Sequence, residues 1–147
     1  MKKFICAVLT FVLVLTLFVP TSFAMEEDYR RIVYEVEKTN IGIENLVDQA
    51  IKDVEKEIRR HNQEIIKLQN LEENTNKDID KLTYKSELKL ERKINQIIDC
   101  LIDDTNKLAG RMIKDADKVG IKVICEYVEV EIGNQKVLID PLRVVGF

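Results

Sequence analysis

Three neighbouring aspartates are the residues whose type and spacing come nearest to a catalytic pair. In a helix, the step of four residues from Asp99 to Asp103 places both carboxylates on one face, with Asp104 beside them. Paired carboxylates can act as acid and base in glycoside cleavage. Such sites are usually clefts lined by aromatic rings, and this sequence has no tryptophan and only 6% aromatic residues. We therefore interpret the cluster as the solvated flank of a helix and hold a small carboxylate hydrolase as the less favoured alternative.

The single histidine, His61, offers little to a catalytic or metal-binding hypothesis. A hydrolytic triad needs a nucleophile and an orienting acid around the histidine, and a metal site needs several ligands. His61 instead follows Ile58 and precedes Ile65 on one helical stripe, so we interpret it as a packing residue. The sequence predicts no catalytic residue, no metal site and no cofactor.

A second acidic group partly matches a calcium-binding loop. Asp115, Asp117, Gly120 and Glu126 fall at positions 1, 3, 6 and 12 of the EF-hand pattern. The match fails at position 5, which is Val119, and a strand rather than a helix is expected to follow. We interpret the match as accidental and Gly120 as a helix cap.

The amino-terminal segment has the pattern of a secretory signal peptide. Lys2 and Lys3 precede an uncharged, apolar run from Phe4 to Val19, and Pro20 and Thr21 interrupt the helix before the small residues Ser22 and Ala24. We expect cleavage after Ala24, so that residues 1–24 are removed. The alternative is an uncleaved anchor, although the run is shorter than the roughly 20 apolar residues that a spanning helix needs.

Once the signal is removed, the remaining composition indicates one mildly acidic, exported domain. Loss of two lysines leaves 21 basic and 26 acidic residues, a net charge of −5. The basic residues alternate with acids, which disfavours nucleic acid as a partner. The richness in Ile, Lys, Glu and Asn is typical of an exported protein of a low-GC Gram-positive bacterium.

Two cysteines remain in the exported chain, Cys100 and Cys125, and two interpretations of them stay open. An even number in an exported protein permits one disulfide, which would tie the second helix to the first strand. Either residue can equally be a small buried hydrophobe.

Apolar residues then recur at steps of three and four along two long segments, as in coiled-coil helices. In the first segment Asn40 falls in the stripe and Gly42 beside it, so a bend or restart is expected there, with Thr39 or Asn40 as a cap. Polar residues between Asn70 and Asp78 predict a turn near 72–78, and a turn at 83–86 is the alternative. The second helix is expected to stop at Gly120.

The last segment changes to a period of two. Val128, Val130 and Ile132 alternate with glutamates, and two turn residues, Gly133 and Asn134, precede a second alternating run. This pattern predicts a tight hairpin with Val130 opposite Val137, Val128 opposite Ile139 and Glu131 opposite Lys136. Pro141 should end the second strand, leaving an apolar tail.

The expected fold is mainly α, with a long antiparallel helical hairpin over 25–120 and a β-hairpin with a tail over 121–147. Its apolar stripe is too wide for two helices alone to cover. We expect a non-enzymatic interaction or scaffold module at the cell surface, whose partner is another protein or a second copy. The alternative is an accessory protein that binds a cell-envelope polymer or membrane through Tyr127, Leu138 and the tail. The stripe expected to carry the contact comprises Val47, Val54, Ile58, His61, Ile65, Ile94, Ile97 and Leu101.

Overall fold

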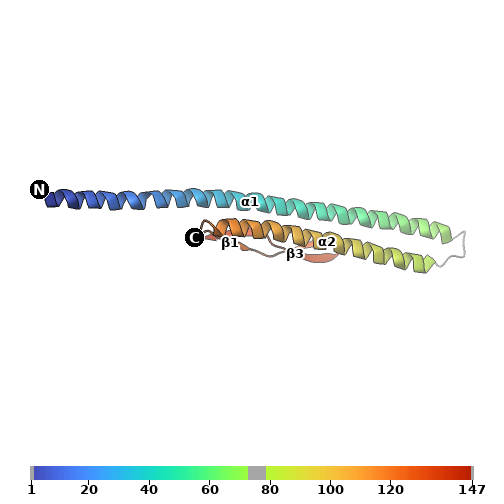
Figure 1. Cartoon of the computed structure of the whole chain (residues 1–147). Helices are drawn as coiled ribbons and strands as arrows, with labels where there is room; N and C mark the ends of the chain where they lie inside the picture. The colour runs from blue at the N-terminus through green and yellow to red at the C-terminus, as the bar shows by residue number, and fades with distance from the viewer. Residues whose placement is uncertain (1, 73–78, 147) are drawn as a thin grey trace.

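The computed structural model confirms a mainly helical fold with a carboxyl-terminal β element (Figure 1). It describes the backbone of residues 2–72 and 79–146, and the side chains of residues 25–70 and 79–146. The elements are α1 (Lys2–Glu72), α2 (Ile79–Asp117), β1 (Lys122–Cys125), β2 (Val128–Ile132), β3 (Gln135–Ile139) and β4 (Leu142–Gly146). The two helices lie side by side, and the amino-terminal part of α1 projects past the end of the other elements (Figure 1).

Both helices are more continuous than the sequence suggests. The expected turn near 72–78 lies outside the described residues, apart from the end of α1 at Glu72. The alternative turn at 83–86 is wrong, because α2 is helical there. Ser86, which lies where the apolar pattern is interrupted, is buried against α1. The expected break at Pro20 and Thr21 is also wrong. Helix α1 continues through Pro20, although an internal proline removes one intrahelical hydrogen bond and its ring crowds the carbonyl four residues earlier.

The bend expected at Asn40 is likewise absent, because its side chain has a tertiary role. The Asn40 amide accepts a bond from the Leu142 N–H (2.8 Å) and donates one to the Leu142 carbonyl (2.9 Å). Thr39 does not cap either, since its hydroxyl donates to the Glu35 carbonyl one turn earlier. Asn40 therefore attaches β4 to α1 without interrupting the helix.

Helix α2 ends at a glycine cap. The Ile121 N–H donates to the Ala116 carbonyl and the Gly120 N–H donates to the Asp117 carbonyl, with Gly120 at φ 74°. These two bonds form a Schellman motif, which places the buried Ile121 against the last turn. The chain then enters β1.

The β2–β3 hairpin has the register that the sequence predicts. Val128 pairs with Ile139, Val130 with Val137 and Glu131 with Lys136. Gly133 and Asn134 form the turn, both with positive φ (56° and 67°), as a type I′ turn requires. The hairpin thus presents its valines and isoleucines on one face, toward the helices.

A second two-stranded sheet, β1–β4, is the main departure from the expected fold. The tail after Pro141 is strand β4, which pairs antiparallel with β1 so that Cys125 lies opposite Leu142. Because the β2–β3 hairpin is inserted between the two strands, no turn sequence announces their pairing. The Glu126 N–H donates to the Pro141 carbonyl where the chain passes between the two sheets.

The core has two parts, each built from both helices and one sheet. The β2–β3 hairpin covers a cluster around Val54, Ile94 and Leu101. The β1–β4 sheet covers a second cluster around Val36, Met112 and Ile121. Neither cluster includes the described helix ends 59–70 and 79–89, where α1 and α2 contact each other alone.

Candidate interaction sites

The structure divides the predicted stripe between the core and a more open face. Val54, Ile94 and Leu101 are buried in the core, and Val47 lies in a hollow beside the strand residues Val128 and Ile139. The others are half-buried on the helices: Ile58, His61, Ile65 and Ile97. Much of the stripe is therefore internal packing, covered by the β2–β3 hairpin.

An apolar hollow on the helix pair is lined by residues of α1 and α2 and by no strand residue. This open groove has Leu46, Ala50, Ile97, Cys100 and Leu101 as its apolar walls and a volume of about 430 Å³. Along α2, Lys93 lies at one end of the groove, where it pairs with Glu57 of α1, and Asp104 lies at the other. At 1.5 Å per residue these two positions are about 16 Å apart along the helix.

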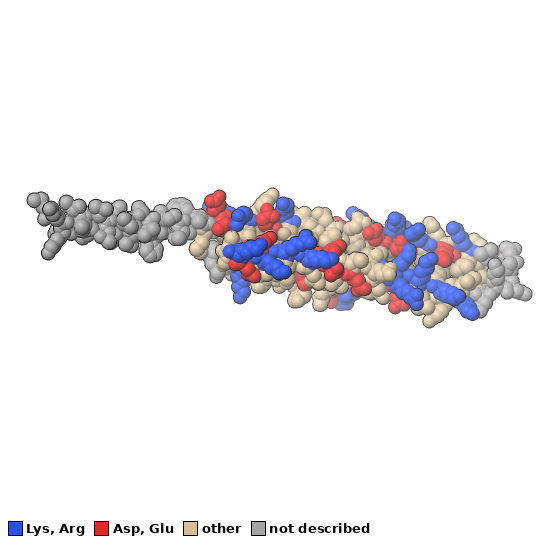
Figure 2. Space-filling model, viewed as in Figure 1, with Lys and Arg blue, Asp and Glu red and all other residues tan. Residues whose placement is uncertain are grey.

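Charge is distributed unevenly along the molecule. In residues 59–70 and 79–93, at the end remote from the termini, eight basic and four acidic residues give a net charge of +4. The remainder of the described chain from residue 25 carries −7, from 19 acidic and 12 basic residues. Figure 2 shows one group of lysine and arginine side chains over the helices toward this end and another over the part of the molecule nearer the termini.

A polar cleft lies between the helices in this basic part. The distal cleft is lined by Glu57, Arg60, His61, Gln63, Glu64, Lys67, Ser86, Lys89, Leu90 and Lys93, with a volume of about 350 Å³. His61 Nδ1 and Ser86 Oγ lie 3.1 Å apart, joining α1 to α2. Ser86 is only 6% exposed and no acid is bonded to His61 among the described residues, so the pair lacks the geometry of a nucleophile and base.

Glu57 is held by cations from both helices. Lys93 of α2 contacts Glu57 Oε2 at 2.7 Å, and Arg60 of α1 contacts Oε1 at 2.9 Å. The hydrogen bond from Lys93 lowers the pKa of Glu57, and the bond from Arg60 acts in the same direction against the effect of burial. Glu57 is therefore ionised at neutral pH and bridges the open groove to the distal cleft, both of which it lines.

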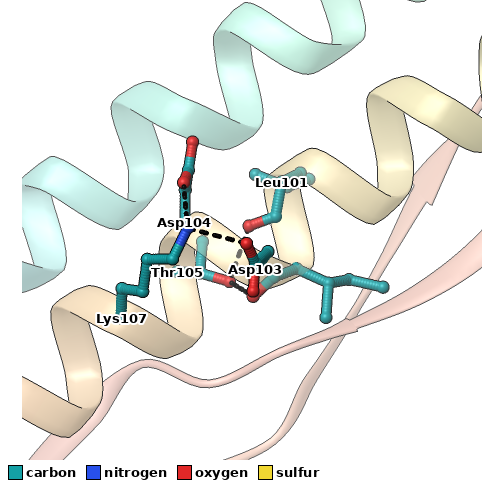
Figure 3. Close-up of polar contacts among 6 residues, drawn as sticks. Leu101, Asp103, Asp104, Thr105 and Lys107 are labelled. Atoms are coloured by element: carbon teal, nitrogen blue, oxygen red, sulfur yellow. Dashed lines mark hydrogen bonds and ion pairs between the residues drawn. The ribbon is translucent and has the colours of Figure 1, made fainter.

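The aspartate cluster on α2 is an ion-pair cluster at the surface. Lys107 Nζ contacts Asp103 at 2.7 Å and Asp104 at 3.4 Å (Figure 3). The bond to Asp103 raises the pKa of Lys107, which keeps the ammonium charged between the two carboxylates. Asp99 lies on the same flank and lines a shallow hollow with Asp103. Thr105, in contrast, is buried and donates to the Leu101 and Ile102 carbonyls.

The residues of the EF-hand-like match are not assembled around a common point. Asp115 pairs with Lys118 at 2.6 Å, and this hydrogen bond lowers the pKa of Asp115. Glu126 pairs instead with Arg143 of β4, beyond the strand that follows Gly120. Among the described residues, no group of three or more His, Cys, Asp or Glu side chains is arranged to hold a metal ion.

Cys100 and Cys125 are free thiols in different surroundings. Cys100 is exposed on α2 at the wall of the open groove, whereas Cys125 of β1 packs against the second core cluster. Burial raises the pKa of the Cys125 thiol, and the nearby Asp140 carboxylate raises it further. The thiolate, which is the reactive form, is therefore scarcer at Cys125.

In protein dilute enough to leave the open groove unoccupied, we expect a thiol-reactive dye at neutral pH to label Cys100 rapidly and Cys125 slowly. The Cys100→Ser variant should lose the fast phase and keep the slow one, and the slow phase should accelerate as the pH is raised because more Cys125 becomes thiolate. Stopped-flow absorbance and peptide mapping measure both phases. A secreted product without titratable thiols would instead indicate that the disulfide forms.

The alternative hypothesis assigns binding of an envelope polymer or membrane to Tyr127, Leu138 and the tail, and only part of this surface is exposed. Tyr127 and Leu138 are 70% and 59% exposed. The tail is not free, because Leu142 is buried and β4 is paired along its length. Deleting the tail would therefore remove a strand from the fold as well as a surface.

Several residues that shape these sites are polar and do not follow the apolar periodicity of the helices. Ser86 and Thr105 occupy buried positions between the helices, and Lys67, Lys89 and Lys93 line the distal cleft. The sequence does contain a signal for Ser86. The helical stripe lacks an apolar residue between Leu82 and Leu90, and Ser86 lies at the missing position, four residues from each. The local excess of lysine and arginine in 59–93 was the signal for the cleft.

No family model, curated protein or solved structure matches this chain. Within residues 25–70 and 79–146, no helical segment combines the length and apolar character that crossing a membrane requires.

Proposed function

We propose that this protein is an exported, non-enzymatic interaction module that associates with a second copy of itself through the open groove. The observation that carries the proposal is an apolar groove, on the helix pair, that none of the four strands lines. Ile97 and Leu46 line it although both also touch the core, and Cys100 is exposed in its wall. Burial of such apolar surface against a partner is favourable by roughly 25 cal/mol per Å².

The charges at the groove ends favour a second copy as the occupant. A two-fold axis that lies in the interface, perpendicular to the helix axes, would place Lys93 of each copy near Asp104 of the other, forming the same contact twice. Lys93 would then lie between Asp104 of the partner copy and Glu57 of its own chain. The basic distal part of each copy would then lie toward the acidic part of its partner, which steers the antiparallel arrangement. The result would be a four-helix layer with a β-hairpin on each outer side.

The signal-peptide pattern supports export, and it also sets the form to be tested. Expression with the native residues 1–24 in a Gram-positive secretion host should yield a product whose sequenced amino terminus is Met25. Intact mass and terminal sequencing check this first step, and the secreted product is then used for the measurement of association.

We expect the secreted product to be a dimer at micromolar concentration and the Ile97→Asp variant to be a monomer. A carboxylate at the centre of the groove would have to be buried without a partner, which costs several kcal/mol. Sedimentation equilibrium measures the mass, and circular dichroism checks that helix content is kept. Cys100→Lys provides a second test, because Cys100 is exposed and belongs to neither core cluster.

Ile66→Asp is the matched control, because Ile66 is 55% exposed on α1 and does not line the groove. It introduces the same charge and should leave the dimer intact. A wild-type product that stays monomeric up to about 100-fold above micromolar concentration would contradict the proposal, as would equal dimerisation of wild type and Cys100→Lys.

A further inference from the structure

The distal cleft has an excess of positive charge that the protein itself does not neutralise. Four cationic residues line it, Arg60, Lys67, Lys89 and Lys93, against the two carboxylates Glu57 and Glu64, which gives a net charge of +2. Arg60 and Lys93 are both occupied by Glu57. Among the described residues, Lys67 and Lys89 have no ion-pair partner, and they extend from opposite helices into the lining of the same cleft.

The floor and the location of the cleft both suit an anion. Its lining includes the hydrogen-bonded His61 and Ser86 in place of the apolar contacts found between the helices elsewhere. Apart from Glu57, its lining belongs to the two segments that together carry +4, so the local field attracts negative charge. Leu90 of this lining also packs against the core cluster under the β2–β3 hairpin. A volume of about 350 Å³ exceeds the size of a single water or halide ion.

We infer that the distal cleft binds a phosphate group, with Lys67 of α1 and Lys89 of α2 as its principal ligands. A phosphate monoester carries about −1.5 to −2 charges at neutral pH, which matches the net +2 of the cleft. Ammonium groups bind phosphate oxygens through short, charge-assisted hydrogen bonds. Glu64 opposes the ligand from the same lining, so it sets the affinity below what the lysines alone would give.

The cleft is built from residues of one copy, and the inference does not depend on self-association through the open groove. The shared chemistry is a phosphate monoester, either free in solution or carried on a lipid headgroup. Inorganic phosphate, glycerol 3-phosphate and vesicles containing phosphatidic acid therefore serve as three probes, with phosphatidylcholine vesicles as the uncharged reference.

The test is a calorimetric titration of the secreted product at low salt, where electrostatic contacts are least screened. We expect Lys67→Gln/Lys89→Gln to weaken binding by at least about tenfold, because two charge-assisted contacts are lost. Glu64→Gln should strengthen binding by about three- to tenfold, because a repulsive charge is removed. A change in opposite directions from two variants of the same cleft cannot arise from general instability.

The matched control is Lys52→Gln/Lys56→Gln, which removes two exposed lysines of α1 outside the cleft and should leave the affinity unchanged. Binding of the soluble probes identifies a free phosphate ligand, and binding of phosphatidic acid vesicles alone identifies a lipid headgroup. Failure of all three probes at millimolar concentration would overturn the inference. So would an affinity that falls equally in the cleft variant and the control.

Discussion

Replacing Gly133 by alanine is expected to lower the free energy of unfolding by about 3 kcal/mol. Gly133 has φ 56°, a left-handed conformation that costs an L-residue roughly 1–2 kcal/mol. A Cβ atom at this position would also lie 2.6 Å from Val54 Cγ1. Val54 is only 1% exposed, so it cannot move aside without disturbing the core. Urea unfolding followed by circular dichroism measures the loss.

Gly120→Ala is the matched control for the conformational part of this loss. Gly120 has a similar φ of 74°, but nothing lies within 4 Å of a Cβ built there. Its replacement should cost about 1 kcal/mol, the left-handed penalty alone. The difference between the two alanine variants then measures the contact with α1.

A double-mutant cycle separates that contact from other effects. Val54→Ala removes the methyl group that the new Cβ would strike, so Gly133→Ala should cost less in this background than in the wild type. Additive losses would contradict the close approach of the hairpin turn to α1. The cycle therefore tests the docking of the β2–β3 hairpin on the helices directly.

The hairpin was predictable because its signals are local. The alternation of Val128 and Val130 with glutamates, the two turn residues and the opposite charges of Glu131 and Lys136 all lie within one short segment. The second role of Gly133 was not predictable, because its contact with Val54 joins positions far apart in the sequence. Turn chemistry explains the positive φ, whereas only the packed fold explains the absence of space for a Cβ.

The pairing of β1 with β4 cannot be predicted from local sequence. Its strands pair across an inserted hairpin, so the partner of Leu142 is Cys125 rather than a neighbour in sequence. Only Arg143 interrupts the apolar residues Leu142, Val144 and Val145, so the pattern does not distinguish an apolar tail from an edge strand. A strand forms here because its backbone can bond to β1 on one side and to the Asn40 side chain on the other.

The sequence predicts which kinds of residue form the candidate sites, but not where on the helix pair those sites lie. A wide apolar stripe indicates that something must cover the helix pair, but not which side the strands take. Once the hairpin occupies the side of Val47 and Val54, Ile97 and Cys100 are left on the open groove. The distal cleft likewise depends on pairing α1 with α2 in register, which brings Lys67 and Lys89 to one lining.

Replacing Asn40 by leucine is expected to lower the free energy of unfolding by about 2–3 kcal/mol. The Asn40 side chain binds both the N–H and the carbonyl of Leu142, so its removal leaves two half-buried backbone groups without partners. Asn45→Leu, an exposed change on the same helix, should have little effect. Hydrogen exchange measured by NMR should show the Leu142 amide exchanging faster in Asn40→Leu than in either wild type or the control.

Asn40→Asp distinguishes the lost donor from the lost acceptor. The introduced carboxylate can still accept from the Leu142 N–H, but it faces the Leu142 carbonyl with a negative oxygen instead of an N–H. When protonated, the carboxyl group regains a donor, so the folded state raises its pKa above the unfolded value of about 3.9. The stability deficit of Asn40→Asp relative to wild type should therefore narrow as the pH falls toward about 4 and change no further below it. The deficit of Asn40→Leu should not narrow, since leucine cannot take up a proton. Parallel pH profiles for the two variants would show that β4 is held to α1 by something other than the Asn40 amide.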